Sequence, residues 1–188
     1  ADRAEQIQTP DLLILPGTKN TIDDLKWLRR TGLESPILNC ARKGIPVLGI
    51  CGGYQMLGNE IDDSCGAETG EVVPGLGLLP VKTVFSLEKH RTRVKGRICA
   101  QSGIWGSVSG CECTGYEIHM GESRICEENA QGFIQLTNQS DLSTRADGCV
   151  RENVAGTYLH GIFDEVGFCG RLIETLCRQK GRNSAVSG

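Results

Sequence analysis

The sequence predicts an α/β protein whose core is a three-layer open sheet, mostly parallel, with appended antiparallel strands. Three features near the N-terminus support this class: an apolar segment at 11–15 that ends at Pro16-Gly17, a second at 45–50 that ends at Cys51, and two helical segments between them. A connection of that length joins parallel strands, because antiparallel neighbours need only a short turn. The continuous apolar run at 47–50 is typical of a strand buried on both faces.

The two helical segments have recognisable ends. The first begins at Asn20 or Thr21, either of which can cap it, and Gly32 stops it. The second covers about 35–43 and ends at Gly44, just before the second strand. The pair therefore forms a crossover that makes the two strands parallel neighbours or near neighbours.

The rest of the chain changes character. Between 60 and 74 it is polar and acidic, which indicates a loop. Further on, Gly and Ser clusters separate short β-like runs, so we expect antiparallel strands there; the runs are 81–85, 94–99, 115–120, 132–136, 149–150 and 154–159. A C-terminal amphipathic helix at about 164–178 places these residues on one side: Val166, Cys169, Leu172, Ile173, Leu176 and Cys177.

The overall composition excludes several classes of function. A net charge of −3 and a pI near 5.7 give no electrostatic reason to bind nucleic acid or an anionic membrane surface. No segment reaches the roughly 18 consecutive apolar residues that indicate a membrane span. The short basic stretch at 89–95 is interpreted as a solvated loop or an edge-strand face.

The ten cysteines indicate reduced cytoplasmic thiols rather than disulfides or a metal site. A chain of 188 residues has a core large enough to be stable without cross-links. The nearest pairs, Cys111 with Cys113 and Cys169 with Cys177, lack the paired C-x₂-C spacing of a structural zinc site. We therefore expect no metal and single out Cys51 alone.

Cys51 is the strongest candidate for a catalytic residue. Gly49 and Gly53 flank it at the spacing of a nucleophile elbow, a turn so tight that neighbouring side chains must be absent. The thiol would lie at a helix N-terminus, so we expect the helix dipole to lower its pKa. The N–H of Gly52 would then face the oxyanion formed when the sulfur attacks a carbonyl carbon.

Two further strand ends should lie at the same edge of the sheet, where ligands bind in open α/β folds. His160 follows the run at 154–159 and is better placed than His90, in the basic stretch, to be the base and proton carrier for the thiol. Gly17 follows the first strand and could supply a second oxyanion N–H, although a plain turn explains it equally well.

Five segments identify a family that the chain resembles. They are 15–25 (LPGTKNTIDDL), 49–58 (GICGGYQMLG), 75–80 (GLGLLP), 115–121 (GYEIHMG) and 156–163 (GTYLHGIF). In this order they resemble the glutamine amidotransferase domain of cobyric acid synthase, within the class I, triad-type amidotransferases of flavodoxin-like fold. The elbow alone fits any such amidotransferase, whereas the first and fourth segments point to the cobyric acid synthase branch.

The resemblance implies that the chain hydrolyses L-glutamine. Cys51 would attack the side-chain amide to form a γ-glutamyl thioester, and His160 would protonate the departing ammonia. The main-chain amides of Gly17 and Gly52 match the oxyanion positions of the family. The resemblance also implies substrate binding by Gln55 and by Glu117, although support of the fold explains Glu117, and its neighbour His119, equally well.

One departure concerns the histidine. Most triad amidotransferases have an orienting glutamate two residues after it, and Ile162 occupies that position here, as the branch generally allows. Asp164 and Glu117 are the candidates to orient His160 instead.

A second departure concerns the length of the chain. We expect residues 1–188 to be a single amidotransferase domain, a fragment that lacks the first core strand and an upstream ATP-dependent synthetase domain. The chain contains no G-x-x-x-x-G-K-[ST] loop, so we expect no cofactor in it, and ATP and Mg²⁺ only in the synthetase domain. That partner domain would use the ammonia to amidate a corrinoid, adenosylcobyrinic acid a,c-diamide.

Other functions stay open at this point. The chain could belong to cobyrinic acid a,c-diamide synthase or to an enzyme that amidates a cell-wall precursor. It could also be a catalytically silent docking domain, or a cysteine hydrolase of the same fold that prefers γ-glutamyl peptides or other amides.

Overall fold

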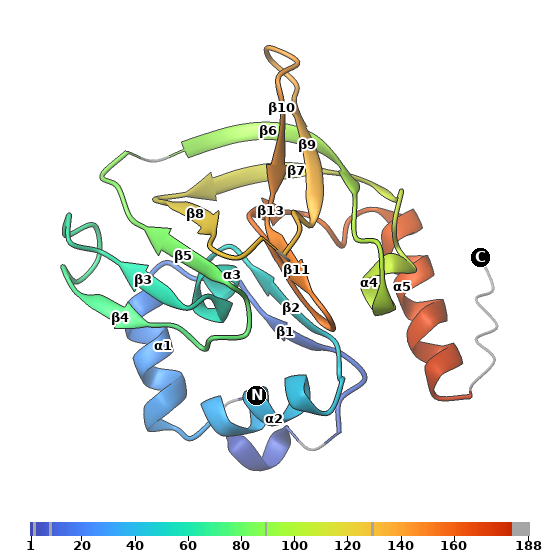
Figure 1. The fold of residues 1–188 in the computed structure, drawn as a ribbon, viewed down its shortest axis with the longest axis horizontal. Helices are drawn as coiled ribbons and strands as arrows, with labels where there is room; N and C mark the ends of the chain where they lie inside the picture. Colours follow the sequence, from blue (N-terminus) through green and yellow to red (C-terminus); the bar gives the residue numbers. More distant parts are fainter. Residues whose placement is uncertain (2, 8, 89, 129, 182–188) are drawn as a thin grey trace.

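The computed structural model describes residues 1, 3–7, 9–88, 90–128 and 130–181, and it confirms the α/β class (Figure 1). The central sheet has the strand order β1-β2-β12-β11, with the first three strands parallel and β11 antiparallel. These strands are β1 (Leu13–Leu15), β2 (Val47–Ile50), β11 (Cys149–Arg151) and β12 (Val154–Thr157). The predicted parallel pairing of the first two strands is therefore confirmed.

Both faces of the central sheet are buried, which explains the continuous apolar run in β2. Val47 and Val154 belong to one apolar cluster, whereas their neighbours Leu48 and Ala155 belong to a second on the opposite face. Helices complete each cluster: α1 (Thr21–Arg30) and α2 (Glu34–Arg42) the first, α4 (Gly103–Gly106) and α5 (Val166–Gln179) the second. Figure 1 shows the central strands between these two pairs of helices.

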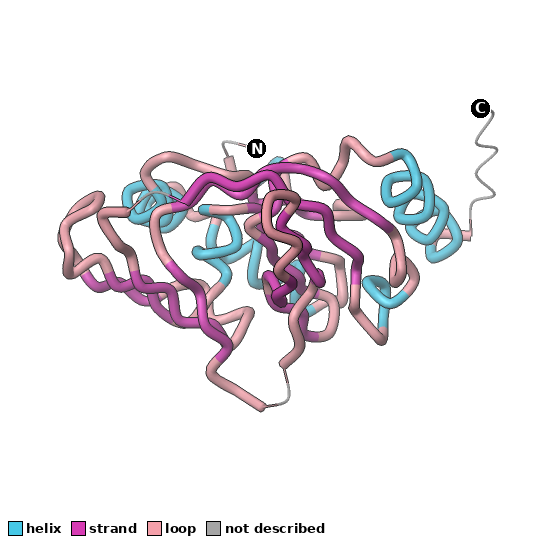
Figure 2. The backbone as a smooth tube through the Cα atoms, turned by 90° about the horizontal axis from the view of Figure 1, so that it is seen from above, coloured by secondary structure: helices cyan, strands magenta, loops and turns pink. Residues whose placement is uncertain are grey.

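Two further sheets are attached to this core. One is antiparallel with the order β10-β9-β6-β7-β13, and the other is mixed with the order β4-β3-β5-β8. In Figures 1 and 2 the long strands β6 and β7 arch across the molecule, with α5 beyond one end. The remaining elements are η1 (Ala4–Gln6), α3 (Gly52–Leu57), β3 (Glu60–Asp62), β4 (Val72–Pro74), β5 (Val81–Val84), β6 (His90–Ile98), β7 (Glu112–His119), β8 (Glu122–Ile125), β9 (Ile134–Asn138), β10 (Thr144–Asp147) and β13 (Leu159–His160).

The first two helices agree with the prediction to within a residue, and their ends have the expected cause. Gly32 and Gly44 follow α1 and α2 with φ of 74° and 76°, the left-handed conformation that ends a helix. Asn20 occupies the N-cap position of α1, but its side chain makes no capping hydrogen bond.

Several predictions for the later part of the chain are wrong. The expected loop at 60–74 contains β3 and β4, which bury one side chain each, Ile61 and Val73, and so carry little strand signal. The strands β8 and β10 lie outside the predicted runs, because their residues are mostly exposed and polar. In α5, Val166 and Ile173 are exposed rather than buried.

The strand predicted at 154–159 is interrupted. Strand β12 ends at Thr157, and the chain passes through Tyr158 into β13, which pairs with β7 of the antiparallel sheet. His160 therefore belongs to the antiparallel sheet and not to the central sheet.

The basic stretch matches one of the two interpretations offered for it. Its described part opens β6 and pairs with β7 from His90 onward, whereas pairing with β9 begins at Val94. The stretch is therefore a strand rather than a loop, and its first residues lie at an open edge; Lys89 lies outside the described residues. None of the helices in the described part of the chain combines the length and apolar character needed to cross a membrane.

Candidate active site

Cys51 lies on the sharp turn that the sequence predicts. Its φ of 52° and ψ of −113° are values that non-glycine residues rarely adopt. A Cβ on Gly49 would lie 2.7 Å from the backbone nitrogen of Tyr54, and a Cβ on Gly53 would lie 2.1 Å from the carbonyl oxygen of Leu15. Both glycines are therefore required, because α3 starts in direct backbone contact with β2 and the end of β1. This is the geometry of a nucleophile elbow.

The loop after β1 brings Gly17 and His160 to the same place. A Cβ on Gly17 would lie 3.2 Å from Cε1 of His160 and 3.4 Å from Cβ of Cys51, so both side chains contact this stretch of backbone. Gly52 packs against the same loop, since a Cβ on it would lie 3.2 Å from the nitrogen of Thr18. The residues predicted from three separate strand ends are thus neighbours.

The surroundings of Cys51 favour a protonated thiol. Burial raises the pKa of Cys51, the N–H of Gly52 opposes this, and the charges of Asp147 and Glu68 add to the increase. The expected lowering of the pKa is therefore wrong, because desolvation outweighs the N-terminus of a short helix. Sγ donates a hydrogen bond to the carbonyl oxygen of Ile118 at 3.4 Å. A thiol in this setting needs a neighbouring base before it can act as a nucleophile.

His160 is the candidate for that base. Its Nε2 is buried and has no hydrogen-bond partner among the described residues. Ile162, at the position of the glutamate found in most triad amidotransferases, is fully buried. Of the two acids considered for orienting the ring, Glu117 pairs with Arg145 and Asp164 is exposed. The structure therefore gives His160 neither of them as a hydrogen-bond partner within the described part of the chain.

A cavity of about 290 Å³ opens beside Cys51. Gln55 lies in its wall with both amide atoms held: Oε1 accepts a hydrogen bond from Thr21 and Nε2 donates one to the hydroxyl of Tyr158, each at 3.1 Å. The side chain that the sequence predicts to bind substrate is therefore fixed in place. The full lining is Thr18, Lys19, Asn20, Thr21, Cys51, Gln55, Ala67, Glu68, Phe85, Ile118, His119 and Met120.

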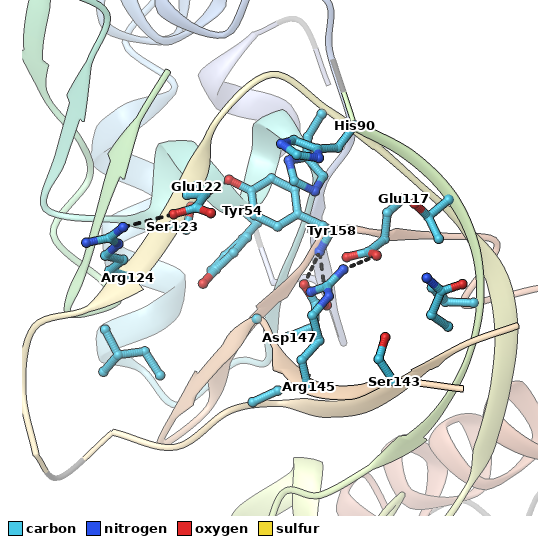
Figure 3. Close-up of a pocket in the computed structure, with 17 residues that line it drawn as sticks. Tyr54, His90, Glu117, Glu122, Ser123, Arg124, Ser143, Arg145, Asp147 and Tyr158 are labelled. Carbon is cyan, nitrogen blue, oxygen red and sulfur yellow. Dashed lines mark hydrogen bonds and ion pairs between the residues drawn. The ribbon is translucent and has the colours of Figure 1, made fainter. Parts of the chain in front are cut away.

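Glu117 lies in a second, neighbouring cavity of about 570 Å³, shown in Figure 3. Its side chain is buried, Oε2 pairs with Arg145, and Oε1 has no partner among the described residues. His119 lines both cavities, and its ring stacks on that of Tyr158 with 4.0 Å between centroids; burial lowers the pKa of His119. The geometry thus separates Glu117 from the Cys51 cavity, and substrate binding by Glu117 stays a prediction.

The sequence analysis missed a loop that forms one side of the Cys51 cavity. Asp63 is fully buried and accepts hydrogen bonds of 2.7–2.9 Å from the four backbone N–H groups of 67–70. Burial alone would raise the pKa of Asp63, but these hydrogen bonds together lower it. The loop carries Glu68, which accepts a hydrogen bond from the N–H of Ile22 at 3.0 Å. The only signal in the sequence is an aspartate before small residues and glycines, which an ordinary acidic loop shares.

The cysteines and acids do not gather into a metal centre in the part of the chain that the structure describes. No three or more His, Cys, Asp or Glu side chains there are arranged to hold a metal ion. All ten cysteines are free thiols; of the two pairs nearest in sequence, Cys111 and Cys113 are buried, and Cys169 and Cys177 are partly buried.

Comparison with known proteins identifies the class to which this fold and site belong. Residues 1–168 match the CobB/CobQ-like glutamine amidotransferase domain, so the chain belongs to that family. It is therefore a glutamine amidotransferase domain, the glutamine-hydrolysing part of an enzyme, and the resemblance identified from the sequence is confirmed.

Relatives point to a particular branch of the family. The chain is 45% identical over 186 residues to the cobyric acid synthase of Lachnoclostridium phytofermentans, with 95% of this chain and 36% of that protein aligned. It is 43% identical over 180 residues to the cobyric acid synthase of Citrobacter koseri, with 94% of this chain and 35% of that protein aligned. The chain thus spans about a third of the length of these relatives.

Solved structures agree on the fold. A crystal structure of a glutamine amidotransferase matches with a TM-score of 0.62 at 16% identity, covering 94% of this chain and 84% of that one. A putative GMP synthase subunit from Thermoplasma acidophilum matches with a TM-score of 0.56 at 17% identity, covering 95% and 78%. At these identities the likeness supports the fold alone.

Proposed function

We propose that Cys51 and His160 hydrolyse the side-chain amide of glutamine through a γ-glutamyl thioester. The observation that carries this proposal is the position of Gly17, whose backbone lies against both side chains. Three parts of an acyl-transfer site thereby come together: a nucleophile, a base and main-chain N–H groups for the oxyanion.

The chemistry follows from the protonation state of the thiol. Because burial raises the pKa of Cys51, His160 must take the thiol proton as the sulfur attacks the amide carbon. The N–H groups of Gly17 and Gly52 stabilise the tetrahedral oxyanion. His160 then gives the proton to the departing ammonia. The γ-glutamyl thioester on Cys51 remains. A water molecule, activated by His160, hydrolyses the thioester to glutamate and restores the thiol.

Gln55 is the residue we propose for holding the substrate. It lies four residues after the nucleophile, in the wall of the same cavity, and its orientation is fixed from both ends. A fixed amide loses little conformational entropy when a ligand binds, so it can recognise glutamine at low cost.

Release of glutamate from glutamine tests this proposal. We expect weak glutaminase activity from the purified chain and none above background from Cys51→Ser. The exposed Cys126 provides the control, because Cys126→Ser should match the unchanged protein. Equal rates from the folded Cys51→Ser variant and the unchanged chain would contradict the proposal.

For the protein as a whole, we propose a cobyric acid synthase in the cytoplasm. The support is the name shared by the relatives that are 45% and 43% identical. The ammonia would pass to an ATP- and Mg²⁺-dependent synthetase domain that amidates adenosylcobyrinic acid a,c-diamide.

Acceptor assays on the full-length enzyme distinguish this function from those of neighbouring branches. We expect ATP-dependent amidation of adenosylcobyrinic acid a,c-diamide with glutamine as the nitrogen donor. Amidation of a cell-wall precursor instead, at a higher kcat/KM, would overturn the choice of branch while leaving the glutaminase proposal intact.

A further inference from the structure

The nucleophile and its base are attached to different sheets. Cys51 directly follows β2 of the central sheet, whereas His160 lies in β13, which pairs with β7 of the antiparallel sheet. The chain crosses from one sheet to the other between Thr157, the last residue of β12, and Leu159, the first of β13. The conformation of this crossing therefore determines where the imidazole lies relative to the sulfur.

Thr157 connects the crossing to the elbow. It is fully buried, and its carbonyl oxygen accepts a hydrogen bond of 2.8 Å from the N–H of Cys51. Its hydroxyl accepts a hydrogen bond of 3.0 Å from the N–H of Leu159 and donates one to the carboxylate of Asp147. One residue thus contacts the nucleophile's own backbone and the start of the histidine strand.

Asp147, the last residue of β10, holds the crossing from the other side. Its carboxylate is buried and also accepts a hydrogen bond of 3.2 Å from the N–H of Tyr158; Figure 3 shows the two residues together. Backbone packing keeps it there, since Gly148 has a φ of 71° and a Cβ on it would lie 2.0 Å from the carbonyl oxygen of Gly156. Close backbone packing of the next residue, Gly148, therefore holds Asp147 against β12 in addition to its side-chain hydrogen bonds.

A carboxylate at this depth is unfavourable, because burial opposes the charged form and only hydrogen bonds or counter-charges compensate. The charged side chains facing it are Arg145, from the same strand, and Glu117, from β7, and these two pair with each other. Asp147 lines the larger cavity and not the one beside Cys51, so glutamine bound against Cys51 would not touch it.

We propose that Asp147 is a positioning residue for glutamine hydrolysis, which acts through Thr157 and Tyr158 to set the place of His160 relative to Cys51. The inference rests on the proposed roles of Cys51 and His160. It predicts a specific kinetic signature: loss of Asp147 slows proton transfer in the chemical step and leaves the binding of glutamine unchanged.

Steady-state kinetics of four variants test the proposal. In Asp147→Ala and Thr157→Val we expect kcat for glutamate release to fall at least about tenfold, with KM within about twofold of the unchanged chain. Asp147→Asn keeps one acceptor oxygen and should recover most of the rate. The control is Asp141→Ala, because Asp141 lies in the exposed turn of the same hairpin, where its carboxylate accepts hydrogen bonds from Ser143.

A wild-type kcat in Asp147→Ala, with folding verified by circular dichroism, would overturn the proposal, as would a raised KM with an unchanged kcat. If Asp147→Ala does not fold, Thr157→Val decides, since valine has nearly the shape of threonine.

If the chain without substitutions shows no glutaminase activity, that result counts against the proposed function rather than against the positioning role. The NMR signal of the His160 Cε1–H then decides: a shift in Thr157→Val but not in Asp141→Ala supports the proposal, and no shift in either overturns it.

Discussion

The two halves of the candidate site are built in different ways. The half that holds Cys51 is made from β1, β2 and α3, held together by close backbone contacts that only glycines permit. The half that holds His160 is made from β7, β10 and β13: β13 pairs with β7, and the buried Asp147 at the end of β10 hydrogen-bonds to Thr157 and Tyr158 just before β13. Local steric requirements therefore define the turn at Cys51, and tertiary hydrogen bonds define the position of His160.

The largest effect is expected at the elbow. Gly53→Ala would place a Cβ 2.1 Å from the carbonyl oxygen of Leu15, and because both groups are backbone neither can move aside. We expect a loss of at least about 3 kcal/mol in the free energy of unfolding, measured by urea denaturation.

Gly170→Ala is the matched control for this prediction. Gly170 lies inside α5, and a Cβ on it would meet no atom within 4 Å. Alanine in a helix should therefore stabilise the protein by about 0.5–1 kcal/mol. If both alanines were tolerated equally, the steric account of the elbow would be wrong.

The contrast between the two halves also explains what the sequence could predict. The glycines around Cys51 and the run in β2 encode their own conformation, so the parallel pair, the elbow and the neighbours Gly17 and His160 follow from the pattern. Asp147 carries no such signal, because its partners are fixed only when β10 and β12 meet.

The pKa of the thiol is a further case in which the sequence misleads. The helix N-terminus after Cys51 is visible in the sequence, but the burial that outweighs it depends on β7, which covers the sulfur with the carbonyl of Ile118. Desolvation arises from the whole fold, so no local motif reports it.

The next effect tests whether polar groups also organise the nucleophile half. Asp63→Ala removes the acceptor for four backbone N–H groups, so we expect it to lower the free energy of unfolding by about 3 kcal/mol.

The stabilisation by Asp63 should also depend on pH. The pKa of Asp63 is lowered in the folded state, so the stabilisation is present above the unfolded-state pKa and is lost as the pH falls through the folded-state pKa. Glu71→Gln, at an exposed ion pair, should change stability by less than about 0.5 kcal/mol. A similar small change in Asp63→Ala would show that the loop does not depend on its carboxylate.

The histidine half should show the opposite dependence on pH. Burial raises the pKa of Asp147 to about 6, so between about pH 4 and pH 6 the folded chain binds a proton that the unfolded chain releases. Stability should therefore fall by about 2 kcal/mol as the pH rises through this window. Asp147→Asn should remove that slope, with Glu117 and Arg145 left in place. Urea denaturation at a series of pH values measures it, and a slope unchanged by the substitution would contradict the assignment.

The smallest effect concerns the contact between the two halves. Tyr158→Phe removes the hydroxyl that accepts a hydrogen bond from Nε2 of Gln55, so we expect a loss of about 1 kcal/mol in stability and a higher KM for glutamine. Ser123→Ala removes the other partner of that hydroxyl and leaves the contact with Gln55 intact, so its KM should stay unchanged. Equal KM values in the two variants would show that the orientation of Gln55 does not affect substrate binding.

The central claim is that Cys51 and His160 act together on one carboxamide, and covalent labelling tests it most directly. An electrophilic glutamine analogue should add one label to the chain at Cys51, as located by peptide mass spectrometry. In His160→Asn the label should appear at least about tenfold more slowly, because the thiol keeps its proton. A label on another cysteine, or an unchanged rate in folded His160→Asn, would contradict the account.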